Sequence, residues 1–403
     1  MTTTRNDAAG LTERVADLQG RMREFIDSEV CPQEKVIDAG GEAGEAVMRG
    51  LKEDAKKRGL WALGHPTDLG GGGLSFMEFV HLNEIIGRSE FGQVAVGSVS
   101  QHDTIMWQRF GTPEQRERWL TGLVNGDYQW IAIGLTEPDA AGSDPTEMKT
   151  TAELDGDEWV INGHKWFTSW ADLAPGVLVW AKTDPDAKSK HQQFSAIMVP
   201  NDTPGYEQVR VIPTMGHTGG HHCELKFTNV RVPKENLFGG RGQGFTIAQT
   251  RLGPGRIFHC MRWLGQMQRA FELMCDRANV RYAHGSLLSE KGEIQRYVAE
   301  SAADIQAHRL MTLDAARVVD QGGDSRVQIS LIKFRGAQYL HNVIDRAIQV
   351  HGALGVTGDT PLEKMYRDAR YARLYDGPDE VHRMVVARQL LRPEKQPPWA
   401  PAS

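Results

Sequence analysis

The stretch CELKFTNVRVP, Cys223–Pro233, alternates apolar and polar side chains. Cys223, Leu225 and Phe227 fall at every second position, which is the pattern of a β-strand with one buried face. Four further β-rich runs precede it: QWIAIGL (129–135), EWVING (158–163), GVLVWAKT (176–183) and FSAIMVP (194–200). We therefore expect a middle β domain over residues 129–240. Within it, Asp155-Gly156 and Asn162-Gly163 have the composition of tight hairpin turns.

Helical patterns flank this region on both sides. Before it, residues 1–128 alternate apolar and charged faces at helical spacing, which predicts an N-terminal helical domain. After it, an apolar stripe predicts a long helix over 257–278, which Pro254 should start or kink. The stripe consists of Ile257, Met261, Leu264, Met267, Phe271 and Met274. Three more helices are expected at 294–319, 328–350 and 379–391. They would make residues 241–395 a C-terminal four-helix bundle, followed by a tail at 396–403.

The order of helices, strands and helices predicts an α+β fold. It lacks the strand–helix alternation of a doubly wound sheet. The glycine run at 70–73 is not followed by Lys-Ser/Thr, which excludes a P-loop. GGRGQGF, residues 239–245, lacks Gly-x-Gly-x-x-Gly spacing, so a Rossmann fingerprint is excluded as well.

Composition narrows the class of protein. A length of 403 residues predicts two or three domains, and a net charge of −6 opposes electrostatic binding of nucleic acid. No apolar run is long enough to span a bilayer, and the N-terminus has no apolar signal-peptide core. The four cysteines, at positions 31, 223, 260 and 275, lack C-x-x-C spacing. We expect a cytoplasmic protein without a disulfide framework, zinc site, nucleic-acid partner or membrane insertion.

The stretch RLYDGPDEVHR, Arg373–Arg383, places a single acid between a tyrosine and a Gly-Pro pair. Asp376 lies three residues before Asp379, which resembles a capping box, and Pro378 suits the first position of a helix. Alternatively, Asp376 takes a proton from a substrate, because a carboxylate in a water-poor pocket can act as a general base. The local sequence leaves both roles open.

Several segments resemble the acyl-CoA dehydrogenase family, and the resemblance covers nearly the whole chain. They are GLWALGHPTDLGGGGLS (59–75), GLTEPDAAGSDP (134–145), INGHKWFTSWA (161–171), FTNVRVPKENLFG (227–239), RLGPGRIFHC (251–260), IQVHGALGVTGDTPLEKMYRDAR (348–370) and YDGPDEVHR (375–383). The Asp-Gly-Pro-Asp-Glu-Val-His run is similar to a sub-group that is also found fused behind kinase-like domains. The resemblance implies bound FAD, a helix–β–helix fold and a homodimer or homotetramer.

The resemblance also implies the chemistry. Tyr375-Asp376-Gly377 lies at the place of the family's Tyr-Glu-Gly motif, whose acid removes the proton alpha to a thioester carbonyl. The alternative base position in the family corresponds to Gly255, which cannot act as a base. We therefore expect Asp376 to be the catalytic base, with capping as a compatible second role, and Gly377 to contact substrate. Hydride would pass from the beta carbon to flavin N5, giving a 2,3-enoyl-CoA, and electrons would pass on to an electron-transferring flavoprotein.

Several expected flavin ligands lie in the β domain. Thr136, beside Leu135, matches the residue that hydrogen-bonds the pyrimidine edge of the flavin. Trp166 and Thr168, with Phe167 between them, match an aromatic side chain that packs on the ring and a hydroxyl that points at N5. Because a β-strand places residues i and i+2 on one face, Trp166 and Thr168 can meet the same ring.

Other positions match parts of the family's ligand sites. Arg281 matches an arginine that reaches the FAD pyrophosphate of a neighbouring subunit, a task that suits a guanidinium group. Gln349 and Gly352 match the loop that receives the adenine half of FAD. Ser143 matches a serine near the flavin and the pantetheine of the ligand, and Arg256 matches a residue that binds the CoA portion.

The sequence also departs from the family pattern. His284 replaces the usual phenylalanine, Ala353 replaces a common second glycine, and Pro378 and Glu380 stand where many relatives have Thr and Gln. The loop before Ser143 is one residue longer than the common form. These departures bear on how adenine and pantetheine would be held.

Two other functions remain open. Nitroalkane oxidases share this fold and use an aspartate base, and a protein with this fold can also act as a scaffold without flavin. The histidines of HTGGHH, His217, His221 and His222, invite a metal site, but no carboxylate or cysteine lies at a suitable spacing. We expect no metal there, and a β-hairpin loop near the pocket instead.

Overall fold

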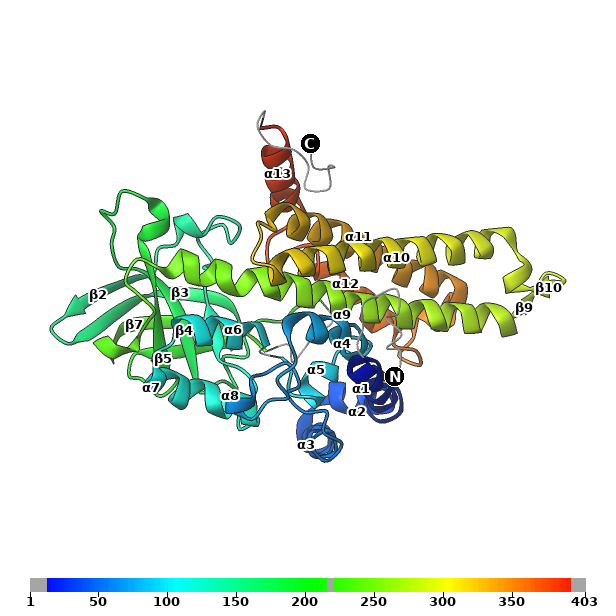
Figure 1. Cartoon of the computed structure of the whole chain (residues 1–403), viewed down its shortest axis with the longest axis horizontal. Coiled ribbons are helices and arrows are strands. Elements are labelled where there is room, and N and C mark those ends of the chain that lie inside the picture. The colour runs from blue at the N-terminus through cyan, green and yellow to red at the C-terminus, as the bar shows by residue number, and fades with distance from the viewer. Residues whose placement is uncertain (1–12, 100, 216–220, 393–403) are drawn as a thin grey trace, which may run out of the picture. The chain divides into compact units, whose positions relative to one another are not determined.

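The computed structural model describes residues 13–99, 101–215 and 221–392 (Figure 1). The chain divides into two compact units. Among the described residues, unit 1 contains 13–64, 72–96 and 253–392, and unit 2 contains 65–71 and most of 97–252. The expected α+β fold is confirmed, since one unit is helical and the other is built on a sheet. The domain boundaries expected from the sequence stay a prediction, and the tail at 396–403 lies outside the described residues.

Unit 1 brings together helices from both ends of the sequence. Its first part contains α1 (Glu13–Phe25), α2 (Glu34–Ala39), α3 (Gly41–Lys57), α4 (Phe76–Ile86) and α5 (Gly92–Ala95). Its second part contains α9 (Gly244–Val280) from Gly253 onward, α10 (Gly292–Asp320), α11 (Arg326–His351), α12 (Leu362–Tyr371) and α13 (Asp379–Leu390). A short hairpin of β9 (Tyr282–Ala283) and β10 (Ser286–Leu287) joins α9 to α10 (Figure 1).

Helices α4 and α9 pack closely because of a glycine. A Cβ on Gly265 would lie 2.1 Å from the carbonyl oxygen of Glu84, closer than real Cβ contacts allow. Nearby, Nδ2 of Asn83 donates a 3.0 Å hydrogen bond to the carbonyl oxygen of Phe258. Residues 175 positions apart in sequence are thus joined in one core, and the same helix carries the site described below.

The apolar stripe of α9 forms core, as expected. Five of its six members are buried, and Phe271 is half-buried. The helix is longer than the predicted one and runs through Pro254, so this proline does not start it. Helices α10, α11 and α13 confirm the other three predicted helices, whereas α12 is missing from the prediction. Its apolar face is narrow, with only Leu362, Met365 and Ala369 buried.

The described part of unit 2 contains an eight-stranded, mainly antiparallel sheet with the order β6-β7-β3-β2-β4-β5-β8, and β1 pairs in parallel with β4. The strands are β1 (Ala132–Gly134), β2 (Thr151–Asp155), β3 (Glu158–Ser169), β4 (Gly176–Lys182), β5 (Phe194–Pro200), β6 (Tyr206–Val211), β7 (His222–Pro233) and β8 (Leu237–Phe238). The helices are α6 (Gln101–Phe110), α7 (Pro113–Gln115), α8 (Thr121–Asn125) and the start of α9. The five β-rich runs become β1, β3, β4, β5 and β7. The prediction misses three strands: β2, β6 and β8. The central residues of β6 are exposed, and β8 has only two residues.

One of the two predicted hairpin turns is confirmed. Asp155 pairs with Glu158 at the end of the β2–β3 hairpin, as the Asp-Gly dipeptide predicts. The turn predicted at Asn162-Gly163 is wrong, because both residues lie inside β3 at a register shift against β7. A Cβ on Gly163 would lie 2.2 Å from Oγ1 of Thr150, so this glycine permits a close approach instead of a turn.

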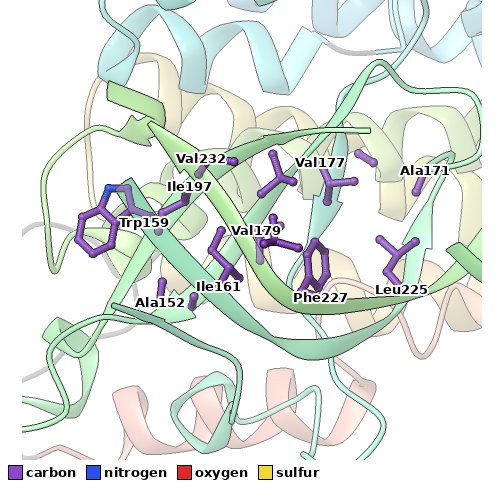
Figure 2. Close-up of a cluster of buried hydrophobic side chains, with 14 of the residues drawn as sticks. Ala152, Trp159, Ile161, Ala171, Val177, Val179, Ile197, Leu225, Phe227 and Val232 are labelled. Atoms are coloured by element: carbon purple, nitrogen blue, oxygen red, sulfur yellow. The ribbon is translucent and has the colours of Figure 1, made fainter. Parts of the chain in front are cut away.

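The core of unit 2 is formed by buried side chains of several of its strands. In β7, Cys223, Leu225 and Phe227 are buried, so the alternation read from the sequence is confirmed. They meet buried residues of β3 and β4, including Ile161, Val177 and Val179 (Figure 2). Among residues 13–99, 101–215 and 221–392, no helix combines the length and apolar character needed to cross a membrane.

Candidate active site

Asp376 lies in the turn that joins α12 to α13, in a strained conformation. Its φ is +53° and that of Gly377 is +100°, a left-handed region that aspartate adopts more readily than most residues. An N-cap residue is extended and is followed by helical residues. The capping role proposed for Asp376 is therefore wrong, and α13 begins at Asp379 with Pro378 as its N-cap.

Side chains from three helices hold the main chain of this turn. Nε of Arg256 donates a 2.8 Å hydrogen bond to the carbonyl oxygen of Asp376, and Nε2 of His382 donates to the same oxygen at 3.2 Å. Nζ of Lys333 donates to the carbonyl oxygens of Ala372 at 2.7 Å and Gly377 at 3.4 Å. The strained position of the carboxylate is thus fixed through its backbone.

A second set of contacts reaches the carboxylate itself. Nε2 of His259 lies 3.3 Å from Oδ2 of Asp376, and the two side chains are only 26% and 19% exposed. Nη2 of Arg262 lies 2.8 Å from the other ring nitrogen, Nδ1 of His259. Arg256, His259 and Arg262 all lie on α9, so a single helix carries one contact to the backbone of Asp376 and one to its side chain.

Burial determines the charge of the neighbouring groups. Burial and the positive charge of Arg262 lower the pKa of His259 to about 4, although the hydrogen bond with Asp376 opposes this shift. Burial likewise lowers the pKa of His382 to about 4. Burial lowers the pKa of Lys333 to about 8, against the attraction of Asp376. At neutral pH both histidines are neutral and most Lys333 side chains are charged.

Aromatic side chains form the rest of the surroundings. Nε1 of Trp263 donates a 2.9 Å hydrogen bond to the hydroxyl oxygen of Tyr375, whose ring centroid lies 4.8 Å from that of His259. Nζ of Lys333 lies 4.9 Å from the ring centroid of Tyr375 and 5.3 Å from that of Trp263. Shielding by rings favours proton uptake by a carboxylate, and the neighbouring cation keeps the carboxylate ionised before that uptake.

Four side chains around Asp376 were not indicated by the sequence. They are His259, Arg262, Lys333 and His382. His259 follows Arg256 by three residues, and helical positions i and i+3 share a face, so this spacing could have indicated it. No signal in the sequence indicated Lys333, because it lies within an apolar helix face that reads as core.

In unit 2, the end of β1 joins β3 at the predicted flavin residues. Oγ1 of Thr136 donates a 2.7 Å hydrogen bond to the carbonyl oxygen of Trp166, and the amide of Trp166 donates to the carbonyl oxygen of Thr136 at 3.1 Å. Nζ of Lys165 donates to the carbonyl oxygen of Leu135 at 3.0 Å. The structure therefore brings Leu135, Thr136 and Trp166 together.

Beneath these residues lies a buried ion pair. Nζ of Lys165 lies 2.8 Å from Oε1 of Glu137, and both side chains are almost fully buried. The amides of Lys149 and Thr150 donate to the same carboxylate at 2.6 and 3.0 Å. The pair fixes the segment in which the predicted flavin residues lie.

A bulge changes the predicted geometry of β3. Lys165 pairs with Leu225 and Thr168 with Cys223, so three steps along β3 match two along β7. The prediction that Trp166 and Thr168 share a face of β3 by simple alternation is therefore wrong. Phe167, with a φ of +49°, occupies the bulge and is 44% exposed.

The hydroxyl group of Thr168 is available to a cofactor. Oγ1 of Thr168 is buried and finds no hydrogen-bond partner among the described residues. Buried hydroxyl groups are normally hydrogen-bonded, so a hydroxyl without a partner among the described residues is a candidate contact for a bound ligand. FAD offers such a partner at the position expected for this residue, so the residues present fit the cofactor.

Ser143 lies in the exposed loop after β1. A Cβ on the preceding Gly142 would lie 3.1 Å from Cγ2 of Thr136, so this loop runs beside the predicted flavin residues. The loop continues into a small, mainly apolar hollow of unit 2. Its lining residues are Leu135, Pro145, Thr146, Met148, Trp180, His191, Phe194, Phe245, Ala248, Gln249 and Leu252.

The remaining predicted residues lie elsewhere in unit 1. Arg281 is exposed, beside the β9–β10 hairpin at the tip of α9 and α10 (Figure 1). His284 occupies the turn of this hairpin with a φ of +50°. Gln349 and Gly352 are exposed at the C-terminal end of α11, where Gly352 adopts a φ of +64° that favours glycine.

His221 and His222 contact other side chains. Nδ1 of His221 lies 2.6 Å from Oδ2 of Asp172, and Nδ1 of His222 lies 3.0 Å from Oγ of Ser169. His217, and with it the predicted loop, lies outside the described residues. Within residues 13–99, 101–215 and 221–392, no three His, Cys, Asp or Glu side chains gather as metal ligands would.

Comparison with known families covers the three parts of the chain in order. The N-terminal domain of acyl-CoA dehydrogenases matches residues 12–127. The middle domain of the same family matches residues 132–230, and the C-terminal domain matches residues 242–391. Together these matches span most of the chain.

Individual proteins that are similar to this chain belong to the same family. FadE2 of Mycobacterium tuberculosis (strain ATCC 25618 / H37Rv), named a probable acyl-CoA dehydrogenase, is 41% identical over 96% of this chain and 97% of its own length. Mouse acyl-CoA dehydrogenase family member 10 is 38% identical over 95% of this chain, which spans only 37% of that relative. A solved structure from Mycobacterium abscessus, described as an acyl-CoA dehydrogenase, superposes with a TM-score of 0.87 at 39% identity, over 94% of this chain and 98% of that one.

Proposed function

The chain is an enzyme of the acyl-CoA dehydrogenase family, and on that premise we propose that it uses FAD and Asp376 to convert an acyl-CoA into a 2,3-enoyl-CoA. One observation carries the proposal. A carboxylate at the place of the family's base is held in a strained turn by Arg256 and His382 and is contacted by His259. Such a rigid, shielded arrangement serves proton transfer better than it serves stability.

Asp376 removes the alpha proton of the thioester in this proposal. Its carboxylate is mostly shielded from water, which brings its basicity closer to that of the weakly acidic substrate. The charged Lys333 nearby favours the negative charge that Asp376 carries before the transfer. Aspartate is one methylene shorter than the glutamate common in the family, so the acyl group has to approach the turn more closely.

Two groups of residues are expected to hold FAD. Leu135, Thr136, Trp166, Phe167 and Thr168 would contact the flavin ring, and Ser143 would lie near it. Arg281, Gln349 and Gly352 would receive its pyrophosphate and adenine half, with Arg281 reaching a neighbouring subunit. The orphaned hydroxyl of Thr168 supports this assignment. Bound FAD supplies the acceptor for the hydride that leaves the beta carbon.

The CoA portion would be bound by Ser143, Arg256 and Gly377. Arg256 already donates Nε to the turn of Asp376, so its contribution to CoA binding would come from its remaining N–H groups. The acyl group itself stays open as to length, branching and hydroxylation.

Partners follow from the same premise. We infer a homodimer or homotetramer, because the exposed Arg281 is expected to serve a neighbouring subunit. An electron-transferring flavoprotein is the expected acceptor. Within the family, the Asp-Gly-Pro-Asp-Glu-Val-His run and the match to member 10 favour the sub-group also found fused to kinase-like domains.

An anaerobic titration of the purified protein with butyryl-, octanoyl- and palmitoyl-CoA tests the proposal. Bleaching of the flavin band, with a new long-wavelength charge-transfer band, is the expected result. A yellow protein that no acyl-CoA bleaches, but that consumes oxygen with nitroethane, would instead establish nitroalkane-oxidase chemistry. A colourless protein that cannot take up FAD would establish the flavin-free scaffold.

A further inference from the structure

We propose that His259, with its tautomer fixed by Arg262, is a positioning residue that donates a hydrogen bond to Asp376 and keeps it in the ionised, oriented form. The inference rests on the proposed role of Asp376 as base. It adds two residues that the family motif does not indicate.

The contacts determine the direction of each hydrogen bond. A guanidinium group has only donors, so Nη2 of Arg262, 2.8 Å from Nδ1 of His259, leaves Nδ1 as an acceptor without a proton. The neutral ring then carries its proton on Nε2, the atom 3.3 Å from Oδ2 of Asp376. The imidazole is therefore the donor and the carboxylate is the acceptor.

This direction excludes two other roles for His259. An imidazolium in an ion pair would carry protons on both nitrogens and would face Arg262 with a donor against a donor. A proton relay would need Nε2 to accept the proton from Asp376, but Nε2 already carries one. His259 is thus a fixed donor and does not take the abstracted proton from Asp376.

The effect on Asp376 follows from its neighbours. The titratable and charged groups around this pair are Arg256, Cys260 and Arg262 on α9, Lys333 on α11, Tyr375 in the turn, and Asp379 and His382 on α13. Arg256, Lys333 and His382 all donate to main-chain carbonyl oxygens of the turn. His259 donates to the carboxylate instead, so its removal should affect the ionisation and orientation of Asp376 more directly than stability.

The experiment compares two substitutions of the same residue. His259→Gln keeps an amide donor towards Asp376 and an amide oxygen that can accept from Arg262. His259→Leu keeps the bulk and loses both. For each FAD-loaded full-length variant, the rate of flavin reduction is measured against pH, with whichever of butyryl-, octanoyl- and palmitoyl-CoA reduces the wild type fastest.

We expect the acid limb of the rate profile to move up by about one pH unit in His259→Leu, because the ionised carboxylate loses a donor. The maximal rate should fall about ten-fold. In His259→Gln the acid limb should move by at most about half a pH unit. An unchanged limb in His259→Leu would overturn the proposal, and so would a His259→Gln limb displaced as far as that of His259→Leu.

A second readout does not depend on activity. In protein labelled with nitrogen-15 histidine, the signal lost in His259→Gln identifies the ring. At neutral pH it should show a proton on Nε2 and none on Nδ1, and Arg262→Met should mix the two tautomers. A doubly protonated ring, or a proton on Nδ1, would contradict the inference even if His259→Leu fails to fold. Failure of every acyl-CoA to reduce the wild type would count against the proposed function alone.

Discussion

Nε of Arg256 donates a 2.8 Å hydrogen bond to the carbonyl oxygen of Asp376, a residue 120 positions later in the sequence. The bond joins α9 to the turn before α13. Because the acceptor is a main-chain oxygen, the bond positions the backbone of Asp376 and leaves both carboxylate oxygens available. His382 and Lys333 also donate hydrogen bonds to this turn, so side chains from three helices together determine the position of Asp376.

Replacing the carboxylate by its amide tests the base directly. Asp376→Asn should lower the rate of flavin reduction by about a thousand-fold, because an amide cannot accept the alpha proton. Asp376→Glu restores a carboxylate one methylene longer and should recover a large part of the rate. The measurement is stopped-flow bleaching of the flavin band with an acyl-CoA. An Asp376→Asn protein that keeps its FAD and bleaches at the wild-type rate would refute the assignment.

The left-handed backbone of the turn at Gly377 should require glycine at this position. At Gly377 the φ is +100° and an added Cβ would lie 2.8 Å from Nε2 of His382. Gly377→Ala should cost about 1–3 kcal/mol of unfolding free energy. By displacing the neighbouring carboxylate, it should also slow flavin reduction by about a hundred-fold. Urea unfolding and stopped-flow reduction measure the two effects.

Gly358→Ala is the matched control for this substitution. A Cβ there meets nothing within 4 Å, and the residue does not have a positive φ. Stability and flavin reduction should both stay close to the wild type. Equal losses in the two variants would mean that the turn of Asp376 has no special geometry.

The fold was largely predictable because its elements carry periodic patterns. The alternation at 223–233 and the stripe on α9 are set by which side chains are buried, so they can be read without tertiary information. Element β6 escaped because its central residues are exposed and leave no apolar pattern. Asn162-Gly163 misled because glycine serves both tight turns and close contacts, and only the packing against Thr150 distinguishes them.

The site was predictable only in part. The motif was enough to propose Asp376 as the base, but whether Asp376 caps α13 depends on backbone angles that the motif does not encode. His259 and Lys333 contribute through contacts between helices far apart in sequence, which local patterns do not contain. The bulge at Phe167 had no signal either, because it arises from unequal steps along β3 and β7.

Removing the hydroxyl group of Thr168 tests whether it binds a cofactor or only supports the fold. Thr168→Val removes no hydrogen bond within the described chain, so the free energy of unfolding without FAD should change by less than about 0.5 kcal/mol. If Oγ1 bonds to bound FAD, flavin reduction should slow about ten-fold, the equivalent of one hydrogen bond.

Thr183→Val provides the contrast. Its hydroxyl donates to Oδ2 of Asp184 at 2.7 Å and lies 2.7 Å from Oγ of the buried Ser195. It should lose about 1–3 kcal/mol of stability and leave the flavin reduction rate intact. The reverse pattern, a destabilised Thr168→Val with normal reduction, would remove Thr168 from the cofactor site.

The buried His65 should make the stability of the folded chain depend on pH. Nε2 of His65 donates to the carbonyl oxygen of Gly97 at 3.1 Å, and Nδ1 lies 2.9 Å from Oγ1 of Thr104. Burial lowers the pKa of His65 from 6.5 to about 4. Between these values the unfolded chain binds a proton that the folded chain refuses, so stability falls as the pH falls. The expected loss from this residue is about 1.4 kcal/mol per pH unit within the window.

His65→Gln should therefore flatten the acid limb of stability measured by urea unfolding from pH 7 down to pH 4. Glutamine can donate towards Gly97 and accept from Thr104, but it does not titrate. His191→Gln, at an exposed position, is the control and should keep the wild-type slope. If His65→Gln loses stability with acid as steeply as the wild type, protonation of His65 does not limit the acid stability of the fold, and the cause has to lie in the other buried groups.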